Sequence, residues 1–163
     1  MGPSVDFEVR HAEPSDYATV IAVVDEWWGG RQMADGLPKL FFVHFRYTSF
    51  VAEQAGTIIG FVAGFRSQTF PEVAYIHYVG IDPAVRGGGV GRALYERFFK
   101  AALRLGCSEV QCVTAPVNRK SIAFHRALGF EFLPGDAESD GVPYSTDYDG
   151  RGASRVRFRK YLT

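Results

Sequence analysis

The chain has 163 residues, the usual size of one folded domain and enough to bury a hydrophobic core. Apolar residues make up 47% of it and charged residues 22%, which is ordinary for a globular protein. Basic and acidic residues number 18 each, which excludes a global charge that would attract nucleic acid or an anionic membrane. Any anion site must therefore be local, built from a few arginines and oriented backbone groups.

The cysteines and the N-terminal residues favour a cytoplasmic protein. Cys107 and Cys112 lack metal-ligand spacing, and a disulfide between them would distort the strand expected there, so we expect free thiols. Residues 1–10 have no signal-peptide pattern, and no apolar run reaches the ~20 residues that span a bilayer. We expect a single domain over residues 1–163, without a metal and without a membrane or nucleic-acid partner.

Hydrophobic periodicity and turn residues predict the elements in chain order. The first half contains an opening strand at 5–11, helices at 14–28 and 37–45, and strands at 49–54, 57–67 and 72–82. The second half contains a helix at 90–105, a strand at 109–114, a helix at 118–128, a strand after Gly129, a polar excursion loop at 135–152 and a closing strand at 155–162. This order predicts a mixed α/β (α+β) sandwich on one mainly antiparallel sheet, not a doubly wound parallel sheet.

A glycine-rich loop lies between the strand at 72–82 and the helix at 90–105, with the sequence Arg86-Gly87-Gly88-Gly89-Val90-Gly91-Arg92. The first turn of a helix leaves backbone N–H groups without intrahelical partners, and the helix dipole adds partial positive charge there. Glycines let a phosphate approach the backbone, and the two flanking arginines offer charge-assisted hydrogen bonds. The loop therefore predicts a phosphate site at a helix N-terminus.

Two common phosphate-binding motifs do not fit this loop. A P-loop requires Gly-Lys-Ser/Thr at its end, whereas Arg92-Ala93 follows Gly91 here. A dinucleotide-binding Gly-x-Gly-x-x-Gly motif that starts at Gly87 or Gly89 ends on Arg92 or Leu94, which is a poor match. A glycine-rich turn without a ligand is the remaining alternative.

The segment 79–94 resembles the acyl-CoA motif of the GNAT N-acetyltransferase superfamily, in which Arg86, Gly89 and Gly91 occupy the defining positions. A second segment, 118–130, resembles the next motif of that family, an Asn followed by a helix that closes in Gly-Phe. The two motifs occur in the expected order and separation. The resemblance implies a sheet of six to seven strands flanked by about four helices, and acetyl-CoA as cosubstrate.

The resemblance also implies which residues bind coenzyme A. The backbone of Val79, Gly80 and Ile81 would contact the pantetheine arm and the acyl carbonyl. The N–H groups from Gly87 to Arg92 would bind the pyrophosphate, with Gly88 and Val90 between them. Asn118 matches the residue that bonds the pantetheine arm, and Ser121 lies one turn later.

The chemistry implied is the attack of an unprotonated amine on a thioester, with a base for the amine and an acid for the thiolate. The family commonly places a tyrosine as the acid where this chain has His125, which either donates the proton or packs on its helix. For the base we favour His77 over Glu72, with ordered water as the alternative. We expect Tyr75 and His77 to share a face with Val79 unless a bulge intervenes.

The resemblance places the acceptor amine where the first two helices meet the central strands. We expect it to be a small molecule or a peptide, and the aromatic residues together with one arginine favour a small amine with an apolar body and a carboxylate. The acidic excursion loop is either solvated or a lid over this site. The candidate acceptor-binding residues are Trp27, Trp28, Arg31, Phe41, Phe45, Gln68 and Tyr75.

Two alternatives to acetyl transfer stay open. The loop recognises the coenzyme and not the acyl group, so another acyl group such as succinyl could be transferred. The missing family tyrosine leaves room for a CoA-binding regulator without turnover. A homodimer that forms through the closing strand, if that strand is an exposed edge, is a further expectation.

Overall fold

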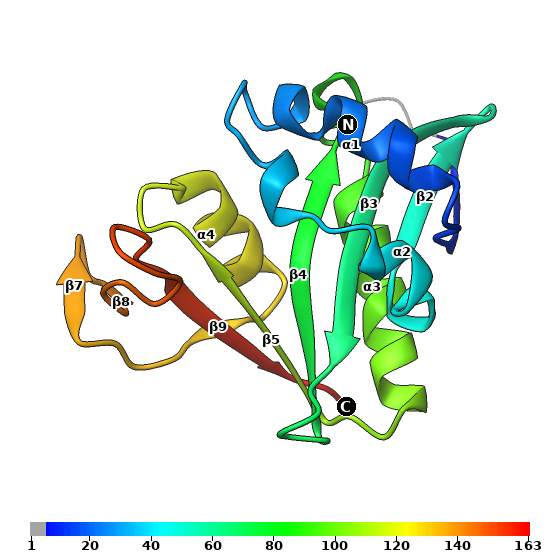
Figure 1. The fold of residues 1–163 in the computed structure, drawn as a ribbon. Coiled ribbons are helices and arrows are strands. Elements are labelled where there is room, and N and C mark those ends of the chain that lie inside the picture. The colour runs from blue at the N-terminus through cyan, green and yellow to red at the C-terminus, as the bar shows by residue number, and fades with distance from the viewer. Residues whose placement is uncertain (1–5) are drawn as a thin grey trace.

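A computed structural model describes residues 6–163, which form one seven-stranded sheet and a separate two-stranded hairpin (Figure 1). The sheet order is β1-β2-β3-β4-β5-β9-β6. Its strands are β1 Glu8–His11, β2 Phe50–Gln54, β3 Thr57–Arg66, β4 Val73–Ile81, β5 Glu109–Thr114, β6 Glu131–Phe132 and β9 Val156–Tyr161. The hairpin consists of β7 Ala137–Ser139 and β8 Val142–Tyr144.

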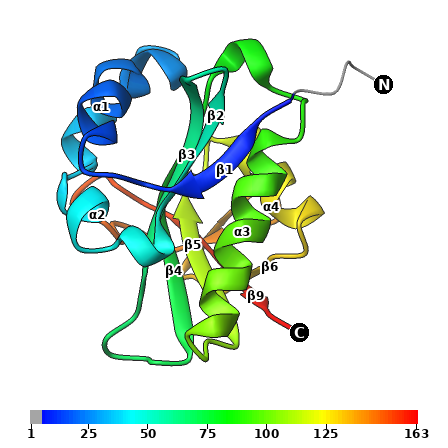
Figure 2. The same ribbon diagram turned by 90° about the vertical axis from the view of Figure 1, so that its right-hand side faces the viewer.

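Helices cover both faces of the sheet (Figure 2). The α-helices are α1 Asp16–Trp27, α2 Leu40–Val43, α3 Val90–Arg104 and α4 Arg119–Ala127. The short 3-10 helices are η1 Ala34–Gly36, η2 Arg46–Thr48 and η3 Pro83–Val85. The first two α-helices lie on one face and the last two on the other, so the mixed, mainly antiparallel architecture predicted from the sequence is confirmed.

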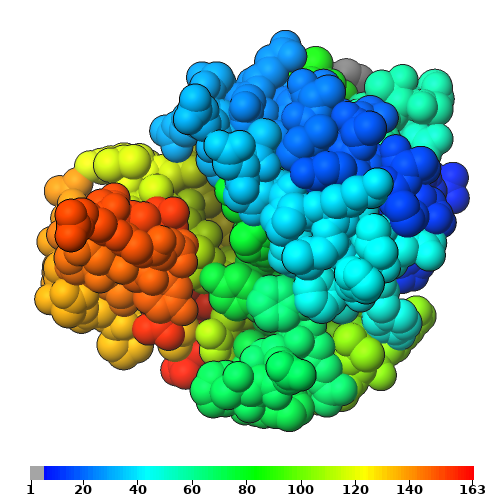
Figure 3. Space-filling model, viewed as in Figure 1, coloured from blue at the N-terminus to red at the C-terminus, as the bar shows by residue number. Residues whose placement is uncertain are grey.

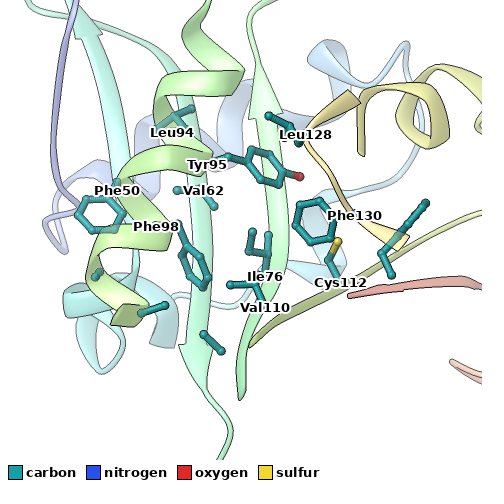
Figure 4. Close-up of a cluster of buried hydrophobic side chains, with 14 of the residues drawn as sticks. Phe50, Val62, Ile76, Leu94, Tyr95, Phe98, Val110, Cys112, Leu128 and Phe130 are labelled. Atoms are coloured by element: carbon teal, nitrogen blue, oxygen red, sulfur yellow. The ribbon is translucent and has the colours of Figure 1, made fainter. Parts of the chain in front are cut away.

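Each face of the sheet has its own hydrophobic core. Apolar residues of α3 and α4 pack on one face, where Leu94, Phe98 and Phe130 are almost fully buried (Figure 4). On the other face, α1 and α2 pack on Phe61 and its neighbours. The strands of the central sheet are therefore apolar on both sides, as the Val-, Ile- and Phe-rich sequence of β3 suggests.

Three expectations are corrected at the ends of the chain. The opening strand begins at Glu8, and its expected start at Val5 lies outside the described residues. The segment 135–152 is not only a loop, because it contains the β7–β8 hairpin. The closing strand is not an edge, because β9 lies between β5 and β6, and this removes the ground for the expected dimer.

The sheet divides between β4 and β5. These two strands form the one parallel pair of the sheet among the described residues, and their pairing covers only Val73 to Tyr75 against Glu109 to Gln111. Beyond that point the strands separate, so β4 from Ile76 to Ile81 has no strand partner on its β5 side. Figure 1 shows the resulting gap between the β1–β4 half and the β5, β9 and β6 half.

Candidate active site

The glycine loop has the backbone geometry of an anion site. The Asp82 side chain accepts a hydrogen bond from the Ala84 N–H and starts η3, after which the chain turns into α3. Gly87 and Gly89 both have φ of 85°, a left-handed conformation that favours glycine. A Cβ at either position would meet no atom within 4 Å, so both point toward open space.

Several N–H groups of this loop are free to bind a ligand. Among residues 6–163, three backbone hydrogen bonds are made here: the Arg86 N–H donates to the Pro83 carbonyl, the Gly88 N–H to Val85 and the Ala93 N–H to Gly89. The other N–H groups of the loop and of the first turn of α3 make no hydrogen bond within this part of the chain, and they belong to Gly87, Gly89, Val90, Gly91 and Arg92. Five unpaired donors at a helix N-terminus suit a pyrophosphate.

The two arginines of the loop differ in their surroundings. The Arg86 Nη2 atom donates to the Trp27 carbonyl at 2.6 Å, which ties the loop to the end of α1. Arg92 is exposed on the first turn of α3. Both arginines are exposed, but Arg86 has a structural hydrogen bond, whereas the Arg92 side chain makes no hydrogen bond within residues 6–163.

A β-bulge interrupts β4 at His77. Ala63 pairs with Tyr78 and Gly64 pairs with Ile76, so the residue between them has no partner on β3. The bulge reverses the side-chain alternation, and Val79 packs with the α3 core while Tyr78 packs with the α1 core. His77 consequently does not share a face with Val79, which corrects the expectation made for an unbroken strand.

His77 is held tightly on the α1–α2 face. Its Nε2 atom donates to the Gly36 carbonyl at 2.5 Å, and its ring stacks on Phe41, with centroids 4.7 Å apart, and on Tyr78 at 4.5 Å. A neutral imidazole that donates from Nε2 keeps an unprotonated Nδ1. The His77 Nδ1 atom makes no hydrogen bond within residues 6–163, and it lies at the point where β4 leaves β5.

Glu72 lies at the other end of β4. Its carbonyl accepts the N–H groups of Ser108 and Glu109, and the residue is exposed just before the strand begins. Five residues separate it from His77, or roughly 16 Å at ~3.3 Å per residue. The structure therefore does not bring Glu72 to the bulge.

His125 is buried between α4 and the sheet, with 5% of its surface exposed. Its Nε2 atom lies 2.8 Å from the Tyr95 hydroxyl, and its Nδ1 atom lies 2.7 Å from the Ser121 carbonyl. The ring stacks on Phe158 with centroids 4.9 Å apart. Burial lowers the pKa of His125 below its ordinary value, although the Ser121 carbonyl opposes this. These contacts favour the packing role over direct proton donation.

Asn118 and Ser121 begin α4. Asn118 is the N-cap, and its Oδ1 atom accepts the Ser121 N–H at 3.2 Å. The Ser121 hydroxyl lies 3.3 Å from His125 Nδ1. Both residues are half-buried at the end of β5 that separates from β4, with the Asn118 side-chain NH₂ left available.

A cleft opens on the α1–α2 face of the molecule, between the lobe of α1 and α2 and the lobe of α4 and the β7–β9 segment (Figure 3). Phe41 reaches this region through its stack on His77, and Tyr75 is half-buried on β4 beside Phe65. Trp27 is buried against Phe61, so it supports the wall of the cleft.

The other predicted acceptor residues differ in exposure. Trp28 and Phe45 are half-buried. Arg31 is exposed beyond α1, and Gln68 is exposed in the β3–β4 turn, away from the bulge.

Other residues at this cleft were not predicted from the sequence. A Cβ at Gly36 would lie 2.0 Å from the Tyr78 hydroxyl oxygen, so η1 packs directly on that group. The Arg157 guanidinium lies over the Tyr148 ring at 4.9 Å. The alternation of the closing strand places its arginines on one face, but a sequence does not tell which strand that face meets.

The comparison with protein families decides the identity of this fold. Residues 11–130 match the family described as Acetyltransferase (GNAT) family. The chain belongs to this family. In this chain the first motif runs from the end of β4 into α3 and the second spans α4, next to the separation of β4 from β5.

Individual GNAT proteins resemble the chain in part or in whole. It is 31% identical over 81 residues to the L-2,4-diaminobutyric acid acetyltransferase of Nocardia farcinica, which covers 50% of this chain and 42% of that protein. The chain spans less than half the length of the curated relatives it matches.

Solved structures establish the fold over nearly the whole chain. The yncA acetyltransferase of Salmonella typhimurium with acetyl-CoA has a TM-score of 0.69 at 20% identity, covering 96% of this chain and 94% of that one. The diaminobutyrate acetyltransferase EctA of Paenibacillus lautus, with its substrate and coenzyme A, has a TM-score of 0.67 at 19% identity, covering 96% and 95%.

The remaining expectations concern metals, membranes and thiols. Across residues 6–163, no three His, Cys, Asp or Glu side chains are grouped to hold a metal ion. Within the same range, no helix is both long and apolar enough to cross a membrane. Cys107 and Cys112 are both free, as predicted, and the structure buries them.

Proposed function

We propose that this GNAT protein transfers an acetyl group from acetyl-CoA to a primary amine. The observation that carries the proposal is the row of unpaired N–H groups at the start of α3, next to the point where β4 separates from β5. The N–H groups would bind the pyrophosphate. The unpaired edge of β4, with Val79 to Ile81, would hold the pantetheine arm, together with Asn118 and Ser121. Acetyl-CoA, when bound, supplies an acetyl group activated as a thioester.

The chain would contribute proton transfer chiefly through His77. A primary amine such as lysine has a pKa of ~10.4 and is mostly protonated at neutral pH, so a base must accept its proton. We propose His77 Nδ1 as this base, because the Nε2 atom is bonded to the Gly36 carbonyl and the residue lies at the bulge where β4 leaves β5. A thiol with a pKa of ~8.5 leaves with little help from an acid. We propose that His125 supports α4 and that water protonates the thiolate.

The acceptor would be a small amine or a peptide amine that enters the cleft between η1 and the β8–β9 loop. The N. farcinica relative is named for the acetylation of diaminobutyric acid, which supports a small amine. Arg31, which is exposed beyond the end of α1, is a further candidate contact for the acceptor.

Release of free thiol from acetyl-CoA with a panel of primary amines tests the proposal, with mass spectrometry of the products. We expect thiol release that depends on the amine. The product should be heavier than the amine by about 42 mass units, because an acetyl group replaces a hydrogen. Replacing acetyl-CoA by succinyl-CoA distinguishes the acyl group. If coenzyme A binds while no amine in the panel releases thiol, the chain is a CoA-binding regulator and the proposal is wrong.

A further inference from the structure

The floor of the cleft contains three polar groups without a partner in the protein. In the part of the chain that the structure describes, the hydroxyls of Tyr75 and Tyr78 make no hydrogen bond, and the Arg157 guanidinium has neither a hydrogen bond nor an ion pair. No side-chain nitrogen or oxygen in residues 6–163 is both buried and unpaired, so these three groups are open to solvent. Polar groups that converge in a cleft without protein partners are typical of a ligand site.

The topology brings these groups together. Tyr75 pairs with Gln111 on β5, and Gln111 pairs in turn with Arg159 on β9. Arg157 is two residues along β9 from Arg159 and therefore on the same face. The buried face of β9 contains Val156 and Phe158, so the arginines face the side on which α1 and α2 lie. That side is the cleft.

The electrostatics of the phenols agree with this placement. Burial raises the pKa of Tyr75 most, and neighbouring Tyr148 and Asp149 add to the rise. The positive charge of Arg157 opposes it, so the guanidinium lies within electrostatic reach of that phenol. A phenol with a raised pKa stays protonated at neutral pH and donates a hydrogen bond. The same region thus contains a cation and a neutral donor, together with the Asp149 carboxylate, which is paired with Arg155.

Neighbouring charges distinguish Arg157 from the two nearest arginines, Arg155 just before β9 and Arg159 within it. Arg155 is paired with Asp149 at 2.7 Å, and Arg159 is paired with Glu131 at 2.8 Å. Arg157 instead lies over the Tyr148 ring in a cation–π contact, and within the described part of the chain its side-chain N–H groups make no hydrogen bond.

The opposite wall of the cleft is acidic. Asp35 is exposed on η1, and Asp25 lies at the end of α1, where its Oδ1 atom accepts the N–H groups of Met33 and Ala34 at 2.7 Å each. Burial raises the pKa of the Tyr78 phenol most, and the positive charge of Arg155 opposes the rise. The negative charges of Asp149, Asp25 and Asp35 add to it. A ligand that carries both an ammonium group and an anion would match a cleft with carboxylates on one wall and a free guanidinium on the other.

We infer that the acceptor is an amine that carries a carboxylate, and that Arg157 binds this carboxylate with the Tyr75 hydroxyl as a second donor. The inference rests on the proposed acetyl transfer and adds the chemical class of its acceptor. A planar guanidinium matches a carboxylate bidentately, which an ammonium group does not.

Matched pairs of probes test the inference, namely amino acids and their carboxamides with the same side chain. The rate constant kcat/KM for thiol release is measured for each, and the acid-to-amide ratio is compared between the natural chain, Arg157→Met and Arg159→Met. An amino acid and its carboxamide differ in amine basicity, but this difference is the same for every variant and cancels when the ratios are compared. We expect the ratio to fall by about 10-fold or more in Arg157→Met and to stay unchanged in Arg159→Met, with KM for acetyl-CoA unaltered in both.

The outcomes separate this inference from the proposed function. If amines release thiol but Arg157→Met keeps the natural ratio, the inference is wrong and acetyl transfer stands. If no amine releases thiol, acetyl transfer is wrong, and thermal shifts of the CoA-saturated protein with the same probes decide the inference. Stabilisation by the acids that disappears in Arg157→Met supports it, and the absence of stabilisation by any acid overturns it.

Discussion

His77 and His125 show how one residue type takes two roles in one molecule. His77 is half-buried at the cleft and uses one ring nitrogen, whereas His125 is buried and both its nitrogens lie within hydrogen-bonding distance of neighbours. A proton-transfer group needs a free nitrogen within reach of the substrate. The geometry therefore favours His77 for chemistry and His125 for the attachment of α4 to Tyr95 and Phe158.

Substitution of each histidine by phenylalanine separates these roles. We expect His77→Phe to lower kcat by about 100-fold, because general base catalysis contributes ~10²–10⁴ and the aromatic stack on Phe41 survives. We expect His125→Phe to change kcat by less than about 3-fold, although it leaves the buried Tyr95 hydroxyl unpaired and lowers stability by ~1–3 kcal/mol. Steady-state kinetics with a saturating amine provide the measurement. An unchanged kcat with a raised amine KM in His77→Phe would mean that water is the base.

The buried imidazole also predicts how stability depends on pH. Because the pKa of His125 is lowered in the folded state, the unfolded chain binds a proton near pH ~6.5 that the folded chain does not. The stability that depends on a neutral His125 is therefore fully present above about pH 6.5 and is lost as the pH falls below that value. Asp16, whose pKa is lowered by Arg10 against the effect of burial, acts only in the more acidic range near 3.8.

We expect the natural chain to lose stability between about pH 7.5 and about pH 5 more steeply than His125→Gln, in which no imidazole must stay neutral. Urea denaturation at several pH values within that range provides the free energies of unfolding. Parallel curves for the two proteins would contradict the burial of a neutral His125.

At the scale of elements, we expect the N-terminus of α3 to bind the pyrophosphate and its C-terminus to have no ligand. Its N-terminus follows Gly89, at φ of 85°, and its C-terminus precedes Gly106, at φ of 87°. A Cβ at either glycine would meet no atom within 4 Å. The two positions are thus alike in backbone strain and in local space, but only the first lies beside the free N–H groups.

Replacement of these glycines by alanine tests the anion site with a matched control. Each substitution is expected to cost ~1–2 kcal/mol, because a left-handed conformation is unfavourable for a residue with a Cβ. Gly89→Ala should in addition raise the KM for acetyl-CoA by about 10-fold, because its methyl group occupies the space in front of the N–H groups. Gly106→Ala should leave that KM unchanged. Equal KM values in the two variants would mean that the pyrophosphate binds elsewhere.

At the scale of the whole molecule, the central sheet has two halves that are joined by a short stretch of strand pairing between β4 and β5. Strands β4 and β5 pair over three residues each, and β4 is unpaired beyond Tyr75 on that side. A ligand that occupies the gap would contact both halves and would stabilise the folded state by RT ln(1 + [L]/Kd), or about 2.7 kcal/mol at 100-fold excess over Kd.

We expect coenzyme A to slow amide hydrogen exchange on both sides of the gap, in the residues of β4 after the bulge and in the start of α4 around Asn118. Exchange measured by mass spectrometry with and without coenzyme A provides the test. Pantetheine, which lacks the pyrophosphate, is the control. It should protect the amides of β4 from exchange more than those of the glycine loop. Protection confined to the glycine loop would contradict a ligand that spans the gap.

The sequence predicted the elements near the glycine loop closely, because their signals are local. The predicted strand at 109–114 coincides with β5, and the helices at 90–105 and 118–128 differ from α3 and α4 by a residue or two at their ends. Helical periodicity, a capping Asn118 and the glycines at 106 and 129 are readable without tertiary contacts.

The glycine loop, the motif order and the alternation of the strands were thus determined by the sequence itself. Tertiary structure alone decided the environment of single side chains, because one bulge at His77 moves Val79 to the other face and because the register of β9 sets which residues its arginines meet. It buried His125, left Glu72 and Gln68 away from the bulge, and brought Arg157 to the cleft from the far end of the chain. Local patterns specify backbone conformation, whereas proximity between distant segments arises only when the sheet assembles.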